Sequence, residues 1–203
     1  MKRRASRPQP HHPERRWKAR SSPRIRVEMG ALDFTIRDFQ RSDFLRLWEI
    51  DQKCFPPGIS YSQLELLSYM RRPRSFTLVA ERRGVAAEGK SGPGRTGEVV
   101  GFIVAEAGRK QTGHIITIDV LDEVRRSGLG SRLMAAAEER LRAQGCQAIF
   151  LETPVDNASA LAFYKRHHYF LVKTIPRYYS TGVDAFVLKK DLLSPLPAAN
   201  FPA

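Results

Sequence analysis

The chain has 203 residues and a formal net charge of +13, with 42% hydrophobic and 27% charged residues. This length can bury one substantial core but not two ordinary domains, and no apolar run approaches the roughly 20 residues of a membrane-spanning helix. Two cysteines, Cys54 and Cys146, lack metal-ligand spacing, so we expect reduced thiols and no metal site. The composition therefore predicts one globular domain that does not cross a membrane.

The positive charge is concentrated at the start of the chain. Residues 1–26 contain ten Lys or Arg and one acid, which gives +9 and leaves +4 for the rest. Four prolines and few large apolar residues prevent this segment from packing a core, and the prolines do not suit the amphipathic helix of a transit peptide. We expect a disordered basic tail over residues 1–30 of a cytoplasmic protein, able to make weak, nonspecific contacts with nucleic acid or ribosomes.

The first regular pattern after the tail predicts one strand and then two helices. Residues Phe34–Phe39 indicate a short strand, after which Ser42 is placed to cap a helix. A second helix over Ser62–Arg72 stops before Pro73, because a residue that precedes proline disfavours helical geometry. The broad apolar face of the first helix contains Phe44, Leu45, Leu47, Trp48 and Ile50.

Three strands then predict an antiparallel meander. β-Branched and apolar residues fill Ser75–Glu81, Glu98–Ala107 and His114–Leu121. The glycine-rich residues Arg82–Gly97 form an enlarged, flexible loop between the first two of these strands. Since the connections are turns or loops rather than helices, neighbouring strands run in opposite directions.

The remainder of the chain alternates helices with strands. We expect helices over Gly128–Gln144 and Asn157–Arg166, and strands over Ala148–Thr153, Tyr169–Ile175 and Asp184–Lys190. The expected fold class is α/β (α+β), with a mixed, mostly antiparallel central sheet of about seven strands flanked by about four helices. This domain occupies residues 31–193 and is followed by a C-terminal extension over residues 194–203.

A glycine-containing run lies between an expected strand and an expected helix. Within Arg125–Ser131, Gly128 and Gly130 let the backbone approach a ligand, and the helix N-terminus favours an anion such as a pyrophosphate. A Gly-x-Gly can equally begin a tightly packed helix. The run lacks the Gly-Lys-Ser/Thr of a P-loop and follows a meander, which disfavours a nucleotide or dinucleotide site.

With the strand before it, this run resembles motif A of the GNAT acetyltransferases, Arg/Gln-x-x-Gly-x-Gly/Ala, at Arg125, Gly128 and Gly130. Residues 151–170 resemble the segment that follows in that family, and the resemblance extends over about residues 35–192. Within the family the chain is most similar to RimI-type and archaeal-type protein N-terminal acetyltransferases. That similarity rests on Cys54, Phe55, Pro56, Glu152, Asn157, Tyr164, Arg177, Tyr178 and Tyr179.

The resemblance implies acetyl-CoA as co-substrate, Glu152 as general base and Tyr164 as general acid. The backbone of residues 118–120 would pair with pantetheine and residues 126–131 would hold the pyrophosphate. The implied cofactor-binding residues are Ile118, Asp119, Val120, Arg125, Arg126, Ser127, Gly128, Leu129, Gly130, Ser131 and Asn157. The implied substrate-binding residues are Phe55, Pro56, Tyr61, Arg177, Tyr178 and Tyr179. Asp119, Thr153 and Pro154 depart from the family pattern, which bears on substrate preference more than on chemistry.

The chemistry also favours an α-amine acceptor. Acetyl transfer needs a neutral amine, a donor to the carbonyl oxygen and a proton for the leaving thiolate. An α-amine with a pKa near 8 is about a tenth neutral at pH 7, whereas a lysine amine with a pKa near 10.4 is almost entirely charged. Glu152, acting through a water, Tyr164 and the Val120 N–H supply these groups. We expect transfer to the N-terminus of a protein, of the ribosomal-protein type.

Several alternatives stay open at this stage. The acceptor could be a lysine or a small amine, or the domain could be a non-catalytic scaffold that binds ribosomes or nucleic acid through its tail. Outside its context, Glu152 is a solvated edge acid and Tyr164 a half-buried aromatic. We interpret His114 as a surface or packing residue, and Cys146 as a packing residue rather than an acyl carrier. A wide groove beside the last hairpin would favour a peptide acceptor, and a closed acidic pocket a smaller amine.

Overall fold

The computed structural model describes residues 25–26, 34–82 and 97–193. Most of the expected tail, nearly all of the expected loop over Arg82–Gly97 and the expected extension over residues 194–203 lie outside this part of the chain. Within it, no helix is long and apolar enough to cross a membrane.

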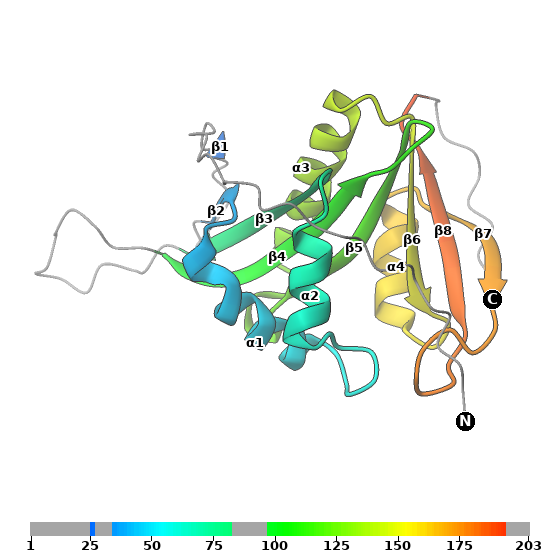
Figure 1. Ribbon diagram of the computed structural model, residues 1–203, viewed down its shortest axis with the longest axis horizontal. Coiled ribbons are helices and arrows are strands. Elements are labelled where there is room, and N and C mark those ends of the chain that lie inside the picture. Colours follow the sequence, from blue (N-terminus) through cyan, green and yellow to red (C-terminus); the bar gives the residue numbers. More distant parts are fainter. Residues whose placement is uncertain (1–24, 27–33, 83–96, 194–203) are drawn as a thin grey trace, which may run out of the picture.

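One mixed sheet forms the centre of the domain, with strand order β1-β2-β3-β4-β5-β6-β8-β7 (Figure 1). Adjacent strands are antiparallel except β5 and β6, which are parallel. The seven expected strands are present, and β1 is an additional two-residue strand within the expected tail. The bounds are β1 Ile25–Arg26, β2 Phe34–Asp38, β3 Ser75–Arg82, β4 Glu98–Ala107, β5 Thr112–Val120, β6 Ala148–Pro154, β7 Phe170–Ile175 and β8 Ala185–Asp191.

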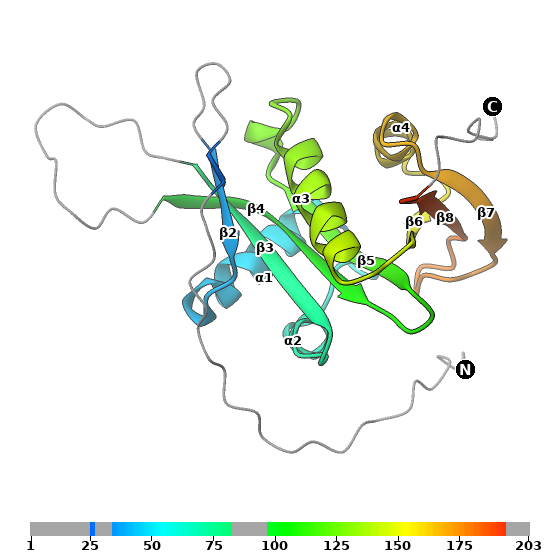
Figure 2. The same ribbon diagram turned by 90° about the horizontal axis from the view of Figure 1, so that it is seen from above.

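Four α-helices cover the two faces of this sheet. Figure 2 shows α1 (Phe44–Cys54) and α2 (Gln63–Met70) on one face, and α3 (Leu129–Ala143) and α4 (Ala158–Arg166) on the other. Because helices cover both faces, β4 between them is buried along most of its length. This arrangement confirms the expected fold class.

The helix starts follow local hydrogen bonding, and one of them differs from the prediction. Ser62 caps α2, since its Oγ accepts from the Glu65 N–H at 3.3 Å. Ser42 does not cap α1. It lies in a 3₁₀ turn over Arg41–Asp43, and Asp43 occupies the cap position. The Asp43 carboxylate accepts from the Gln40 N–H at 2.7 Å and from Arg37, and its contact with Gln40 closes the 3₁₀ turn that leads into α1.

The sheet opens between its two parallel strands. Pairing of β5 with β6 extends only from Thr112–Ala148 to His114–Phe150, although β5 continues to Val120. A bulge in β5 near Ile116 shifts its register against β4 just beyond the last of these pairs. The second half of β5 therefore has a neighbour on its β4 side and an open edge on its β6 side.

Candidate active site

The open edge of β5 presents the backbone groups of two residues. The Leu121 N–H donates to the Val100 carbonyl, so Leu121 and Val100 form a hydrogen-bonded pair with β4. Pairs alternate along an antiparallel ladder, and Ile118 and Val120 therefore occupy non-hydrogen-bonded positions whose N–H and C=O groups point away from β4. They face the gap where β6 has separated. The Val120 carbonyl already accepts from Arg125 Nε and Cys54 Sγ, so an extended polar ligand could pair with the Ile118 groups and the Val120 N–H.

Asp119 differs from its two neighbours, and the expectation that its backbone lines the gap is corrected. Its register against Phe102 places its N–H and C=O on the β4 side. Its side chain is 1% exposed, its Oδ2 accepts from the Thr117 hydroxyl at 2.8 Å, and its Oδ1 has no partner among the described residues. Burial, and to a lesser extent the charge of Asp51, raise the pKa of the Asp119 carboxyl well above its ordinary value. Asp119 is thus a buried acid beneath the site rather than a ligand-facing residue.

The connection from β5 to α3 forms a concave backbone turn. Arg126 has φ +63° and Gly128 has φ +84°, and α3 begins directly afterwards at Leu129. A Cβ on Gly128 would meet nothing within 4 Å, whereas one on Gly130 would come to 3.4 Å from the Phe163 ring. Gly128 therefore borders open space at the helix N-terminus, and Gly130 allows α3 and α4 to approach. A pyrophosphate fits this geometry.

Several side chains predicted to bind the cofactor are engaged within the protein instead. Ser127 Oγ donates to the Val124 carbonyl at 2.7 Å, and Ser131 Oγ lies 2.9 Å from His167 Nε2. Arg125 Nε donates to the Val120 carbonyl at 3.0 Å, and Asn157 Oδ1 caps α4 by accepting from the Ala160 N–H. Any contact of these residues with an anion would use backbone N–H groups or side-chain atoms that are not already hydrogen-bonded. Leu129 is a core residue, 1% exposed.

Glu152 lies on β6 and contacts a residue that the sequence did not single out for catalysis. His114 Nε2 donates to Glu152 Oε2 at 2.7 Å, across 38 positions of sequence. The two side chains are 32% and 22% exposed, so both are accessible to solvent. His114 is a partly exposed residue, as expected from the sequence, and its contact with Glu152 was not foreseen. No local pattern could have indicated this contact. It depends on the parallel pairing of β5 with β6, whose last pair contains His114.

Tyr164 lies on α4 with its ring packed edge-on against Phe163 and Tyr169. It is 8% exposed. Burial, followed by the charge of Asp119, raises the pKa of the Tyr164 hydroxyl. The hydroxyl is therefore protonated at neutral pH and able to donate a proton. Burial raises the pKa of the Tyr179 hydroxyl, and the ionisable groups of Tyr178, Glu152 and Tyr164 raise it further. Tyr179 therefore lies near both catalytic candidates.

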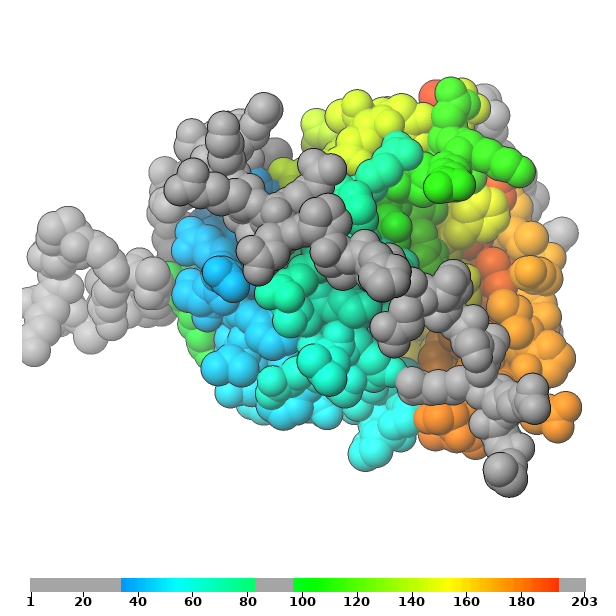
Figure 3. All heavy atoms as spheres, viewed as in Figure 1, coloured from blue at the N-terminus to red at the C-terminus, as the bar shows by residue number. Residues whose placement is uncertain are grey.

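Two loops far apart in sequence meet beside this group. Ser180 Oγ, in the β7–β8 loop, donates to the Gly58 carbonyl, in the α1–α2 loop, at 2.9 Å. The space-filling view shows the two segments touching at the lower edge of the molecule (Figure 3). Within the α1–α2 loop, Tyr61 reaches the bulge of β5, where its hydroxyl donates to the Ile116 carbonyl at 3.3 Å. The structure thus brings the loops that carry Phe55, Pro56 and Tyr61 to those of Arg177, Tyr178 and Tyr179.

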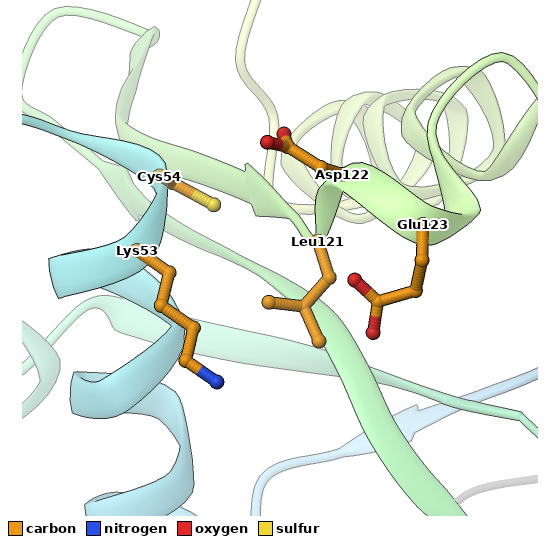
Figure 4. Close-up of a pocket in the computed structure, with 5 residues that line it drawn as sticks. All are labelled: Lys53, Cys54, Leu121, Asp122 and Glu123. Atoms are coloured by element: carbon orange, nitrogen blue, oxygen red, sulfur yellow. The ribbon is translucent and has the colours of Figure 1, made fainter.

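A shallow pocket of about 240 Å³ lies where the end of α1 faces the end of β5. Figure 4 shows Lys53 and Glu123 at its rim and Cys54 pointing toward the β5 side. Cys54 Sγ donates to the Val120 carbonyl at 3.5 Å, and burial raises the pKa of this thiol to about 12. Cys54 is therefore a poor nucleophile at neutral pH. Burial also raises the pKa of Cys146, which is consistent with a packing role.

Family comparison agrees with this geometry. The sequence model of the acetyltransferase (GNAT) family matches residues 44–169. This span contains the open edge, the glycine turn, Glu152 and Tyr164. The chain belongs to the GNAT acetyltransferase family.

Named relatives show which GNAT proteins this chain is similar to. An N-alpha-acetyltransferase of Sulfurisphaera tokodaii is 32% identical over 172 residues, which cover 79% of this chain and 94% of the relative. The N-alpha-acetyltransferase MAK3 of Arabidopsis thaliana is 38% identical over 104 residues, and the matching region spans only about half of each protein, 50% and 54%. The crystal structure of Ard1 from Thermoplasma volcanium superposes with a TM-score of 0.67 at 29% identity and covers 79% of this chain and 99% of that one.

Proposed function

We propose that this GNAT protein transfers an acetyl group from acetyl-CoA to the N-terminal α-amine of a protein or peptide. Glu152 acts as general base and Tyr164 as general acid, by direct attack without a covalent enzyme intermediate. The observation that carries the proposal is the His114–Glu152 hydrogen bond, 2.7 Å long, at the point where β5 and β6 separate. It supports the proposal because a carboxylate held by a hydrogen bond lies beside the open edge that is proposed to hold the acetyl donor.

The described residues fit acetyl-CoA in two places. The backbone groups of Ile118 and the Val120 N–H offer an edge for the amide-bearing pantetheine arm, and the turn around Gly128 offers a helix N-terminus for the pyrophosphate. Solved proteins that share this fold contain acetyl-CoA. In the bound state the Val120 N–H would face the carbonyl oxygen, where negative charge develops.

Glu152 and His114 act together on the incoming amine. The Glu152 carboxylate takes the proton directly or through a water, and the His114 N–H holds that carboxylate in one orientation. An α-amine is the acceptor that demands least of such a base, because about a tenth of it is already neutral at pH 7. Tyr164, protonated and buried, supplies a proton to the departing thiolate.

The loop contact favours a chain end over an internal segment. Because Ser180 and Gly58 join the two loops beside the site, a substrate enters under this bridge by its end rather than lying across an open groove. Relatives named N-alpha-acetyltransferase support the same reading. Lysine and small-amine acceptors remain the second candidate, since a lysine side chain is also narrow enough to enter end-on.

The ribosomal-protein substrate is the least supported part of the proposal. The ribosomal-protein-S18-alanine N-acetyltransferase of Escherichia coli has a TM-score of 0.65, but at 19% identity it indicates a shared fold only. A scaffold without catalysis is disfavoured, because a scaffold has no need for a solvent-accessible carboxylate–imidazole pair at the open edge.

Mass spectrometry tests the activity directly. The purified protein is incubated with acetyl-CoA and a library of peptides that carry both a free N-terminus and an internal lysine, with Glu152→Gln as the matched control. Acetyl groups on α-amines that appear with the parent and not with the variant support the proposal. Acetylation confined to lysine, or equal acetylation by the variant, contradicts it.

A further inference from the structure

Five exposed cations lie at one end of the sheet, where β4 turns into β5. They lie in three neighbouring segments: the α2–β3 loop, the β4–β5 turn and the last turn of α3. No ion pair or side-chain hydrogen bond joins any of them to another described residue. The five, which we call the basic end, are Arg71, Arg74, Arg109, Lys110 and Arg142.

Backbone hydrogen bonds fix these three segments side by side. The Ala107 N–H donates to the Arg74 carbonyl at 3.1 Å, which ties the α2–β3 loop to the end of β4. The Gln147 N–H donates to the Gln111 carbonyl at 2.7 Å, which ties the segment after α3 to the β4–β5 turn. In Figure 1 this end lies at the top, and the α1–α2 and β7–β8 connections lie at the bottom. The basic end is thus a rigid surface remote from the peptide entrance.

Helix stabilisation explains only part of the basic end. Arg71 caps α2 and Arg142 lies in the last turn of α3, where cations interact favourably with the helix dipole. That reason does not apply to Arg74, Arg109 or Lys110, which lie outside helices.

Two acids at this end are paired with other cations. Glu106 pairs with Arg72 at 2.8 Å, and Asp191 pairs with Lys189 at 2.7 Å. Like charges held close together repel, and a polyanion relieves that repulsion while releasing its own counterions.

We propose that the basic end binds the phosphate backbone of a nucleic-acid duplex without reading its sequence. Four of the five cations are arginines, whose planar guanidinium groups bind phosphate oxygens in pairs. No aromatic residue is among the exposed large apolar side chains at this end, where only Leu193, two residues after β8, is exposed. Without exposed aromatics the surface cannot stack on bases, and a single apolar side chain is too little to insert into a membrane.

The position of the surface has a consequence for catalysis. Because the basic end and the Ser180–Gly58 bridge lie at opposite ends of the domain, a duplex bound at one end leaves the peptide entrance free. Nucleic-acid binding and acetyl transfer should therefore proceed independently, and the binding inference does not depend on the proposed activity.

Fluorescence anisotropy with a labelled duplex of about 20 base pairs tests the proposal on the full chain. The variant is R74Q/R109Q/K110Q, and the matched control R41Q/R166Q/K173Q removes three other exposed cations from distant elements. RNA and DNA duplexes of unrelated sequence are titrated between low and moderate salt. The basic N-terminal segment is present in every protein, so differences report the substituted residues alone.

The expected result is a loss of roughly tenfold or more in affinity at about 100 mM salt for the first variant, with the slope of log affinity against log salt reduced by about 2 to 3. The control changes less than about twofold. Equal losses of affinity in both variants would show that only the net charge matters. No loss of affinity in the first variant would show that its cations do not contact the duplex. Loss of binding to anionic lipid vesicles with unchanged duplex binding would assign the surface to membranes. Each of these three outcomes overturns the proposal, while unchanged circular dichroism spectra and melting temperatures show that both variants are folded.

Discussion

Ser180 Oγ donates to the Gly58 carbonyl at 2.9 Å, across 122 positions of sequence, and joins the two loops that flank the candidate acceptor site. Gly58 has φ +92°, and a Cβ there would lie 2.8 Å from Ser180 Oγ, so the close approach requires glycine. This contact makes the entrance to the site a property of two loops together rather than of either one.

We expect Ser180→Ala to weaken peptide binding without affecting the acetyl donor. Loss of one hydrogen bond of about 1 kcal/mol raises the peptide KM roughly fivefold, with kcat nearly unchanged. Steady-state kinetics with a short peptide measure this change. Ser60→Ala is the matched control, because Ser60 lies in the same loop and does not contact the β7–β8 loop. An unchanged KM would show that the bridge lies away from the peptide path.

Glu152→Gln should lower kcat by about 10²-fold or more while acetyl-CoA affinity is retained, because the substitution removes the base and leaves the glycine turn intact. His114→Ala should lower kcat by roughly tenfold, since the carboxylate keeps its charge but loses its orienting partner. The double variant should lose less than the product of the two effects, as expected for groups that act as a unit. His168→Ala serves as control, and multiplicative losses would separate His114 from Glu152.

Gly128→Val should abolish acetyl-CoA binding, measured by calorimetry. A branched side chain would enter the open space beside the turn, and φ +84° is strained for any residue with a Cβ. Gly145→Val is a matched control, because Gly145 has φ +81° and open surroundings but follows the opposite end of α3. The control carries the same strain without the same loss of binding. Equal affinity in both variants would reduce the turn to a helix start.

Asp119→Asn should stabilise the protein relative to the parent, and this gain should be larger at pH 8 than at pH 5. Burial raises the pKa of Asp119 in the folded state, so the protonated form is favoured and stability falls as pH rises above the ordinary carboxyl pKa. Asp51 behaves in the same direction, since burial raises its pKa to about 6. Because asparagine cannot ionise, we expect the melting temperature of the variant to exceed that of the parent by roughly 2 °C or more at pH 8. Glu123→Gln, exposed and equal in charge change, controls for net charge. A difference that is the same at both pH values would contradict the prediction.

The sequence by itself determined the elements and the glycine turn before α3. Alternating and helical periodicities are local, and they located seven strands and four helices with small errors at the ends. The turn was recognisable from Gly128, and the positive φ of Gly128 is a backbone conformation that favours glycine. The Ser42 cap failed because Ser42 lies inside a 3₁₀ turn that begins after Gln40, is closed by the Gln40–Asp43 contact and leads directly into α1.

Only the tertiary structure decided which side chains share the site. His114 and Glu152 meet because α3 crosses over the sheet and makes β5 and β6 parallel neighbours, and that pairing is set by the whole core rather than by either strand. The bulge near Ile116 shifts the register of β5 against β4, and beyond it Ile118 and Val120 occupy the positions that face the open edge. Register, crossover and loop contacts depend on packing across long stretches of chain, and a local pattern does not contain that information.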